Sequence, residues 1–183
     1  MDLREVTEFF RDFMWYIIAF FVIVIIFVFI VSFQPVAGNS MSPTLEEGQV
    51  VLVSKLSYLF SDIQRNEIVV VKKDAKSYIK RVIALPGEKV EYMNGLLYID
   101  GTPYKETFLD ESVITSNFLF IDICSENDCP DGVIPEDMYF VLGDNRPESE
   151  DSRTPEFGLV KRKEIKGKAF FKIWPLNNMG KVN

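Results

Sequence analysis

The chain has 183 residues, 48% of them hydrophobic, and a formal net charge of −7 at pH 7. This length accommodates one globular domain with a hydrophobic core beside a membrane anchor, and the acidic balance argues against nucleic acid as a partner, since its binding requires clustered Lys and Arg. Because the sequence contains no histidine, a Ser-His-Asp triad and a His-built zinc site are both excluded.

The first segments are a short polar tail, residues 1–12, and a stretch without any charge, residues 13–33. At a rise of about 1.5 Å per residue, a helix of this second length spans roughly 30 Å, the thickness of a bilayer's hydrocarbon core. We therefore predict a single transmembrane helix, with Trp15 and Tyr16 near its first interface. The alternative is a cleaved signal peptide, whose apolar region is usually only about 7–15 residues long.

Positive charges predict the orientation of this helix. Arg4 and Arg11 precede it, and no Lys or Arg follows it until Lys55. Because basic residues are retained on the cytoplasmic side, the tail should be cytoplasmic. The domain formed by residues 34–183 should then lie outside the plasma membrane.

This domain is predicted to be mainly β. Short apolar or β-branched runs, bounded by Gly, Pro, Asn or Asp, recur along it. The Asn94-Gly95 pair between two of them predicts a two-residue hairpin, whereas residues 56–64 fit either a short helix or a loop. The predicted strands are 50–54, 68–72, 78–85, 89–93, 96–100, 138–142 and 168–174.

A serine in the loop after the apolar stretch is the first candidate catalytic residue. Ser40 lies in Gly-Asn-Ser-Met-Ser-Pro, and irregular backbone of this kind can present a side chain to a ligand. The alternative is a serine that only satisfies a turn or caps a helix. Without histidine, a nucleophilic serine needs another base, and a lysine kept neutral by apolar surroundings is the general solution.

Lys80 is the candidate base. Alternation along the predicted strand 78–85 gives the lysine apolar neighbours on its own face. The residues on that face are Tyr78, Lys80, Val82 and Ala84. The alternative is an edge-strand lysine that protects the sheet against aggregation.

A polar segment after the predicted strand 138–142 is a candidate support for this pair. Gly-Asp-Asn at residues 143–145 is typical of a turn that ends a strand. Further along, Ser149 can hydrogen-bond a nearby amine, and Asp151 with Arg153 can form an ion pair that fixes the segment.

Together these segments resemble the bacterial type I signal peptidases, membrane-bound serine proteases that remove signal peptides from exported proteins. The resemblance covers most of the chain and rests on four motifs that follow one anchor in the same order. They are Ser-Met-x-Pro-Thr-Leu at residues 40–45, Arg-x-x-Ile-Val-Val at 65–70, Tyr-Ile-Lys-Arg-Val-Ile-x-Leu-Pro-Gly at 78–87 and Gly-Asp-Asn-Arg-x-x-Ser-x-Asp-Ser-Arg at 143–153.

The resemblance implies a β-rich catalytic domain with an apolar surface that rests on the bilayer. It implies that Ser40 is the nucleophile and Lys80 the general base, oriented by Ser149. Asp151 and Arg153 match a structural ion pair beside the site. The residues that match the pockets for small substrate side chains are Val36, Met41, Leu45, Tyr78 and Ile79.

One position departs from part of the family. Some members carry a serine two residues before the nucleophile, and its hydroxyl helps to stabilise the oxyanion. Gly38 occupies that position here. Backbone N–H groups, including that of Ser40, are therefore expected to form most of the oxyanion hole.

The implied function is cleavage of preproteins after small residues, at sites of the Ala-x-Ala type, without a cofactor or a metal. The implied partners are the signal peptides of preproteins and the lipid bilayer, and the protein export channel is a further candidate. Two other functions remain open. Another Ser-Lys hydrolase, such as a self-cleaving repressor, fits the chemistry but not the anchor, and a membrane-tethered, non-enzymatic β domain would bind exported proteins without cutting them.

The two cysteines, Cys124 and Cys129, lie in a polar insertion between the last two motifs. Outside the membrane a disulfide between them is expected, with two free buried thiols as the alternative. Two ligands without histidine do not make a metal site.

Overall fold

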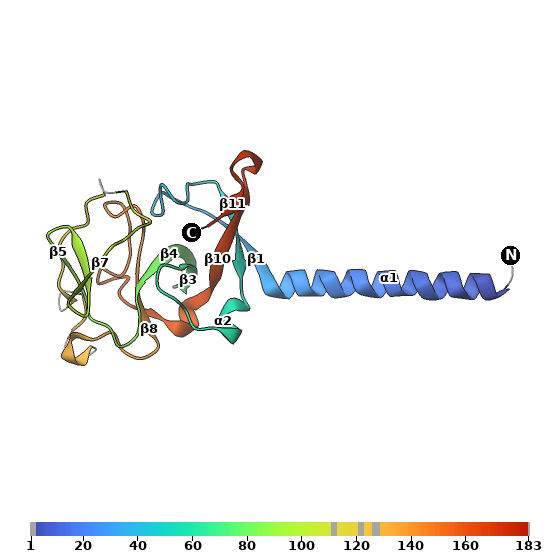
Figure 1. Ribbon diagram of the computed structural model, residues 1–183, viewed down its shortest axis with the longest axis horizontal. Helices are drawn as coiled ribbons and strands as arrows, with labels where there is room; N and C mark the ends of the chain where they lie inside the picture. The colour runs from blue at the N-terminus through green and yellow to red at the C-terminus, as the bar shows by residue number, and fades with distance from the viewer. Residues whose placement is uncertain (1–2, 111–112, 121–122, 126–128, 183) are drawn as a thin grey trace.

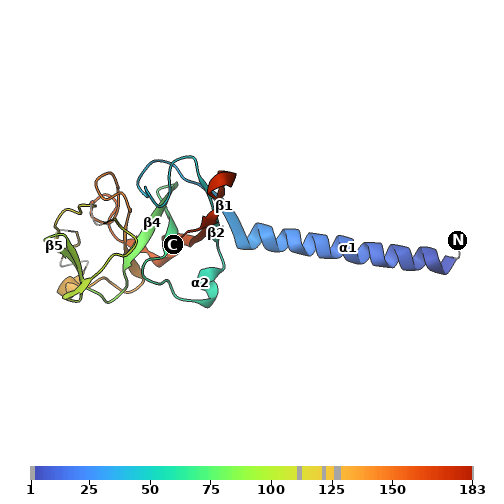
Figure 2. The ribbon, with the colours of Figure 1, turned by 45° about the horizontal axis from the view of Figure 1, so that its top comes forward.

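The computed structural model describes residues 3–110, 113–120, 123–125 and 129–182. A long helix, α1 (Leu3–Ile30), begins within the predicted polar tail and projects from one side of a β-rich domain (Figure 1). The turned view shows the same separation of helix and domain (Figure 2). The segment Glu8–Ile30 of α1 is long and apolar enough to cross a membrane.

The helix ends earlier than the uncharged stretch 13–33 predicts. The last residues of that stretch belong instead to strand β1 (Val31–Pro35), which pairs antiparallel with β2 (Val50–Ser54). The physical reason is that the backbone groups of residues 31–35 form hydrogen bonds with β2. These bonds replace the ones that the groups would form in a longer helix. The N–H of Lys55 closes the junction by donating to the carbonyl of Ile30 over 2.9 Å.

β1 and β2 belong to an eight-stranded sheet in the order β1-β2-β10-β3-β4-β8-β9, with β11 paired to β10. Its described strands pair antiparallel. The other members are β3 (Ile68–Lys73), β4 (Lys76–Ala84), β8 (Met138–Leu142), β9 (Val160–Lys161), β10 (Ile165–Trp174) and β11 (Gly180–Lys181).

A small three-stranded sheet lies at the end of the domain far from α1 (Figure 1). It consists of β5 (Val90–Met93), β6 (Leu96–Ile99) and β7 (Thr102–Tyr104). Asn94 and Gly95 join β5 to β6 with φ values of 52° and 78°, so the two-residue hairpin is confirmed. The short helices are α2 (Ser57–Phe60) and the 3₁₀ turns η2 (Pro130–Gly132), η3 (Arg162–Glu164) and η4 (Leu176–Asn178).

The mainly β fold class is confirmed, since each predicted strand range contains a strand. Two details differ. β10 begins earlier than predicted, because Ile165 already pairs with Val71 of β3. In β4 a bulge between Val82 and Ala84 interrupts the expected alternation, so Ala84 packs in a different cluster from Val82.

Three hydrophobic clusters form among the described residues, and all of them include β4. Ile83 packs in the cluster that joins the small sheet to the main sheet. Val82 packs in a second cluster with Tyr139 of β8. Ile79 packs in a third cluster, which includes side chains of the loop between β1 and β2. β4 is therefore the strand around which the core is assembled.

The two cysteines form a disulfide, Cys124–Cys129. The alternative of two free thiols is thus wrong. Both residues also contact the cluster that joins the two sheets, so the bond fixes a loop to the core of the small-sheet region.

Gly167 of β10 should be sensitive to any side chain. A Cβ there would lie 2.3 Å from the carbonyl oxygen of Ser54 and 2.8 Å from Cγ1 of Val53. We expect Gly167→Ala to lower the free energy of unfolding by about 1–3 kcal/mol, measured by chemical denaturation in detergent. Gly180→Ala is the control, because a Cβ there meets nothing within 4 Å. An equal loss in both variants would contradict the steric explanation.

Candidate active site

Ser40 lies in the loop that connects β1 to β2. Two side chains of this loop, Met41 and Leu45, are almost fully buried and hold it against the domain. The Leu45 N–H also donates to the Met41 carbonyl over 2.9 Å. Gly38 adopts a φ of 75°, which glycine tolerates without strain. The loop thus fixes the backbone around Ser40, which is itself half-buried.

Lys80 lies in β4, directly before Arg81, where the pairing of β4 with β8 begins. Only 1% of the residue is exposed, and its Nζ donates to Oγ of Ser149 over 3.0 Å. Burial lowers the pKa of the Lys80 amine to about 8, and the carboxylate of Asp151 only partly opposes this change. A substantial fraction of the amine is therefore neutral near pH 8.

Gly143 brings the Ser40 loop and the Ser149 side chain together. A Cβ on Gly143 would lie 2.2 Å from Oγ of Ser149 and 2.3 Å from the carbonyl oxygen of Ser40. The N–H of Asn145 donates to the same Ser40 carbonyl over 3.1 Å. Because Ser149 also contacts Lys80, the structure assembles the three residues that the sequence singled out around one glycine.

The ion pair expected between Asp151 and Arg153 is present. Nε and Nη2 of Arg153 donate to the two carboxylate oxygens of Asp151, each over 2.8 Å. Asp151 Oδ2 also accepts the N–H of Gly143 over 3.1 Å. The pair thus ties the end of the polar segment back to the glycine at its start.

A second buried ion pair, which the sequence analysis missed, lies beside the first. Arg81 donates through Nε and Nη2 to Asp144 over 2.9 and 2.7 Å, and both side chains are only 1% exposed. Thr44 of the Ser40 loop donates to Asp144 over 2.6 Å. Their positions in the sequence could have indicated a role at the site, since Arg81 follows Lys80 and Asp144 follows Gly143.

Four of the five residues expected to line the substrate pockets lie together. They are Val36, Met41, Leu45 and Ile79, all in one buried cluster. Tyr78 lies elsewhere, because successive residues of a strand point to opposite faces. Its ring packs edge-on against the ring of Phe157, with 5.2 Å between the ring centroids. Tyr78 thus contacts the cluster that contains Val82.

Within the described part of the chain, no group of three or more His, Cys, Asp or Glu side chains is placed to hold a metal ion. The parts at this site are a loop hydroxyl, a buried amine of lowered pKa and a second hydroxyl bonded to that amine. A hydroxyl nucleophile served by a neutral amine is suited to acyl transfer.

Comparison with known proteins gives a consistent result. The sequence matches the family described as "Signal peptidase, peptidase S26" over residues 9–174. A signal peptidase I of Bacillus caldolyticus is 40% identical over 174 residues, which cover 90% of this chain and 91% of that protein. A signal peptidase IB of Staphylococcus aureus is 38% identical over 168 residues, covering 87% of this chain and 86% of that protein.

A solved structure is similar as well. The signal peptidase I from Enterococcus faecalis matches with a TM-score of 0.50 and 35% identity. The match covers 59% of this chain and 97% of that one.

The lowered pKa of Lys80 should appear in the pH dependence of stability. The amine titrates at 10.5 when unperturbed and near 8 in the folded protein, so between these values the unfolded state binds more protons. The stability of the wild type should therefore rise with pH from about 8 to about 10.5. Lys80→Met should lack this rise and be more stable at pH 7 by at most about 3 kcal/mol.

Urea denaturation of both proteins at pH 7 and pH 10 measures this difference. The other titrating groups are common to both proteins, so the difference isolates Lys80. An identical pH dependence would show that its pKa is not depressed.

Proposed function

The chain belongs to the signal peptidase family, peptidase S26, and on that premise we propose that it removes N-terminal signal peptides from exported preproteins with Ser40 as nucleophile and Lys80 as general base. The observation that carries the proposal is the arrangement around Gly143, where the Ser40 backbone, Ser149 and the buried Lys80 amine meet.

The proposed reaction proceeds by acyl transfer. Neutral Lys80 accepts the hydroxyl proton of Ser40 as its oxygen attacks the carbonyl before the scissile bond, and the departing amine takes a proton from the lysine. Water, activated by the same amine, then hydrolyses the acyl-enzyme. Ser149 orients the amine, and with Gly38 lacking a hydroxyl, backbone N–H groups are assigned to the developing oxyanion.

The substrate would bind as an extended strand along β4. Among the described strands, β8 pairs with β4 only from Arg81 to Ala84, so residues 76–80 have no strand partner on that side and an added substrate strand would pair there. The small, buried cluster around Val36 and Ile79 favours small residues before the cut, because a larger side chain would clash and a charged one would lose its hydration. Sites of the Ala-x-Ala type fit this description.

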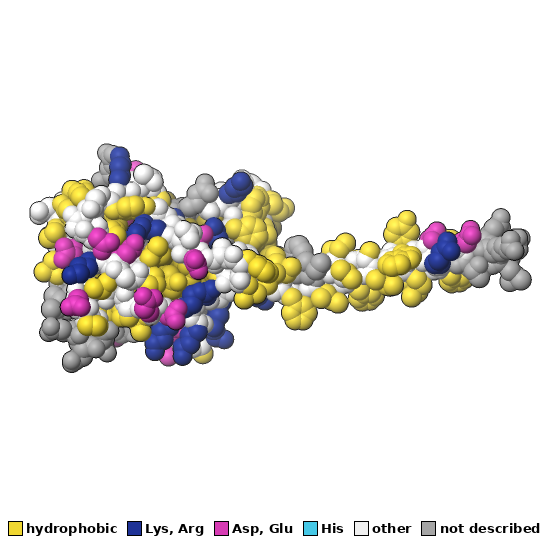
Figure 3. Space-filling model, turned by 60° about the horizontal axis from the view of Figure 1, so that its bottom comes forward, with side chains coloured by type: hydrophobic (Ala, Val, Ile, Leu, Met, Phe, Trp, Pro, Cys, Tyr) yellow, Lys and Arg dark blue, Asp and Glu magenta, His cyan; other side chains and the backbone are white. Residues whose placement is uncertain are grey.

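The anchor supports action at a membrane surface. Exposed hydrophobic side chains continue from α1 onto the end of the domain nearest to it (Figure 3). Leu59 and Phe60 of α2 and Trp174 at the end of β10 are among the exposed hydrophobic residues of the domain. With Arg4 and Arg11 on the cytoplasmic side, the domain would work on the outer face of the plasma membrane. The export channel as a partner stays a prediction.

Cleavage of a preprotein with an Ala-x-Ala site, in detergent micelles, tests the proposal. The wild type should cut once, after the second Ala, whereas Ser40→Ala and Lys80→Ala should each lose activity on the order of 10³-fold or more while remaining folded. Full activity in Lys80→Ala would place the base elsewhere. A wild type that never cuts would favour a binding domain without enzymatic activity.

Matched controls separate chemistry from general damage. Ser42→Ala removes a hydroxyl from the same loop. Lys73→Met removes another lysine whose pKa is lowered by burial but whose Nζ bonds the carbonyl of Leu159 over 3.1 Å. Both controls should keep activity within a few-fold of the wild type.

The pH profile of cleavage tests the role of the lysine independently. Since only the neutral amine accepts a proton, kcat/KM should rise roughly tenfold per pH unit and level off above about pH 8. Circular dichroism across the same range controls for unfolding. A rate that stays constant between pH 6 and pH 9 would count against Lys80.

A further inference from the structure

The segment 143–153 contains a buried arginine that the proposed reaction does not use. Arg146 is 2% exposed, and its Nε donates to the carbonyl of Gly143 over 3.1 Å. Its own carbonyl accepts a hydrogen bond from Nη2 of Arg153 over 2.7 Å. Arg146 thus connects Gly143 at one end of the segment with the Asp151–Arg153 pair at the other.

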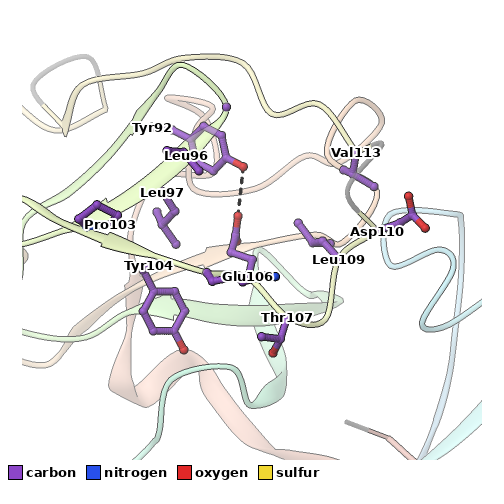
Figure 4. Close-up of a pocket in the computed structure, with 12 residues that line it drawn as sticks. Tyr92, Leu96, Leu97, Pro103, Tyr104, Glu106, Thr107, Leu109, Asp110 and Val113 are labelled. Carbon is purple, nitrogen blue, oxygen red and sulfur yellow. Dashed lines mark hydrogen bonds between the residues drawn. The ribbon is translucent and has the colours of Figure 1, made fainter.

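The partner of this guanidinium comes from the small-sheet region. Glu106 follows β7, and both of its carboxylate oxygens accept hydrogen bonds from Arg146. Oγ1 of Thr115 accepts another over 2.9 Å. Tyr92 of β5 donates its hydroxyl to Glu106 over 3.2 Å, as the dashed line in Figure 4 shows, and its ring lies 6.0 Å from Cζ of Arg146.

Hydrogen bonds hold the Glu106 side chain beside a hollow. Glu106 lines this hollow of about 620 Å³ next to the small sheet (Figure 4), yet only 7% of its side chain is exposed. Its carboxylate is fixed by hydrogen bonds from Tyr92 and Arg146.

We propose that Glu106 is a positioning residue for catalysis, which fixes the segment 143–153 through Arg146 and so couples the small sheet to the Ser40 and Lys80 site. The proposal deepens the proposed function and rests on it for its catalytic part. Glu106 lies outside the four sequence motifs.

The first reason is the cost of a buried, unpaired charge. The Arg146 side chain is 0% exposed, and removing one partner of a buried ion pair is strongly destabilising because the other charge stays buried without compensation. Movement of the segment 143–153 is poorly tolerated, because the space between Ser149 and the Ser40 carbonyl does not admit even a Cβ on Gly143. A displacement of Gly143 would therefore also displace Ser40 and Ser149.

The contacts of Glu106 also indicate which kinetic constant should change. The pocket cluster is built from the Ser40 loop, from strands β2, β3 and β10, and from the side of β4 that carries Ile79. Glu106 contacts a different part of the structure. Loss of the Glu106 charge should therefore displace the reacting groups more than the substrate pockets, so that kcat falls by a larger factor than KM changes.

The test compares the full-length wild type with Glu106→Gln in detergent. Cleavage of the Ala-x-Ala preprotein should show kcat lowered between about tenfold and a hundredfold, with KM changed less than about twofold. Amide hydrogen exchange of residues 143–153 should become faster.

Glu88→Gln is the matched control. It removes a carboxylate that pairs with Arg65 at 2.5 Å in a partly buried pair outside the segment 143–153, so it should change neither kcat nor exchange in that segment. A Glu106→Gln enzyme with kcat within twofold of the wild type, or one in which only KM changes, overturns the proposal.

Two further measurements keep the outcome decisive. If Glu106→Gln does not fold, Thr115→Val removes one acceptor from Arg146 and should lower kcat about two- to fivefold; an unchanged kcat overturns the proposal. If the wild type does not cleave at all, the proposed function has failed. The exchange comparison then decides alone whether Glu106 fixes the segment.

Discussion

Burial of the Lys80 amine is the constraint on which the rest of the site depends. An ammonium group away from water is unfavourable unless a carboxylate compensates it, and the hydrogen-bond partner provided here is the neutral hydroxyl of Ser149. The buried carboxylates of the same region, Asp144 and Asp151, are each engaged by an arginine. Arg153 opposes the effect of the carboxylates, so burial keeps the pKa of the Lys80 amine below its usual value although charged groups surround it.

The sheet topology makes this arrangement possible. β4 lies between β3 and β8 and contributes to all three hydrophobic clusters, so Lys80 is held by a strand that is anchored throughout the core. The loop after β1 carries Ser40, and the segment after β8 carries Ser149, whose hydroxyl bonds the Lys80 amine. At Gly143 the segment lies directly against the Ser40 carbonyl.

The sequence predicted the local features well, because they depend on local patterns. Strand positions, the Asn94-Gly95 turn and the prominence of Ser40 and Lys80 all follow from alternation, turn residues and the lack of histidine. Features that depend on distant partners were not predictable in this way. The helix ends at Ile30 because β2 pairs with the next residues, and the partners of Arg81 and Arg146 come from segments far along the chain.

The direct junction between α1 and β1 has a geometric consequence. β1 begins at the residue after the helix ends, and the Ile30 carbonyl is bonded to Lys55, so no linker separates the domain from the helix. With α1 across a bilayer, this junction would limit the distance between Ser40 and the lipid. For the function proposed above, the depth at which a peptide bond leaves the bilayer would then help to select the cleavage point, together with the side chains that flank it.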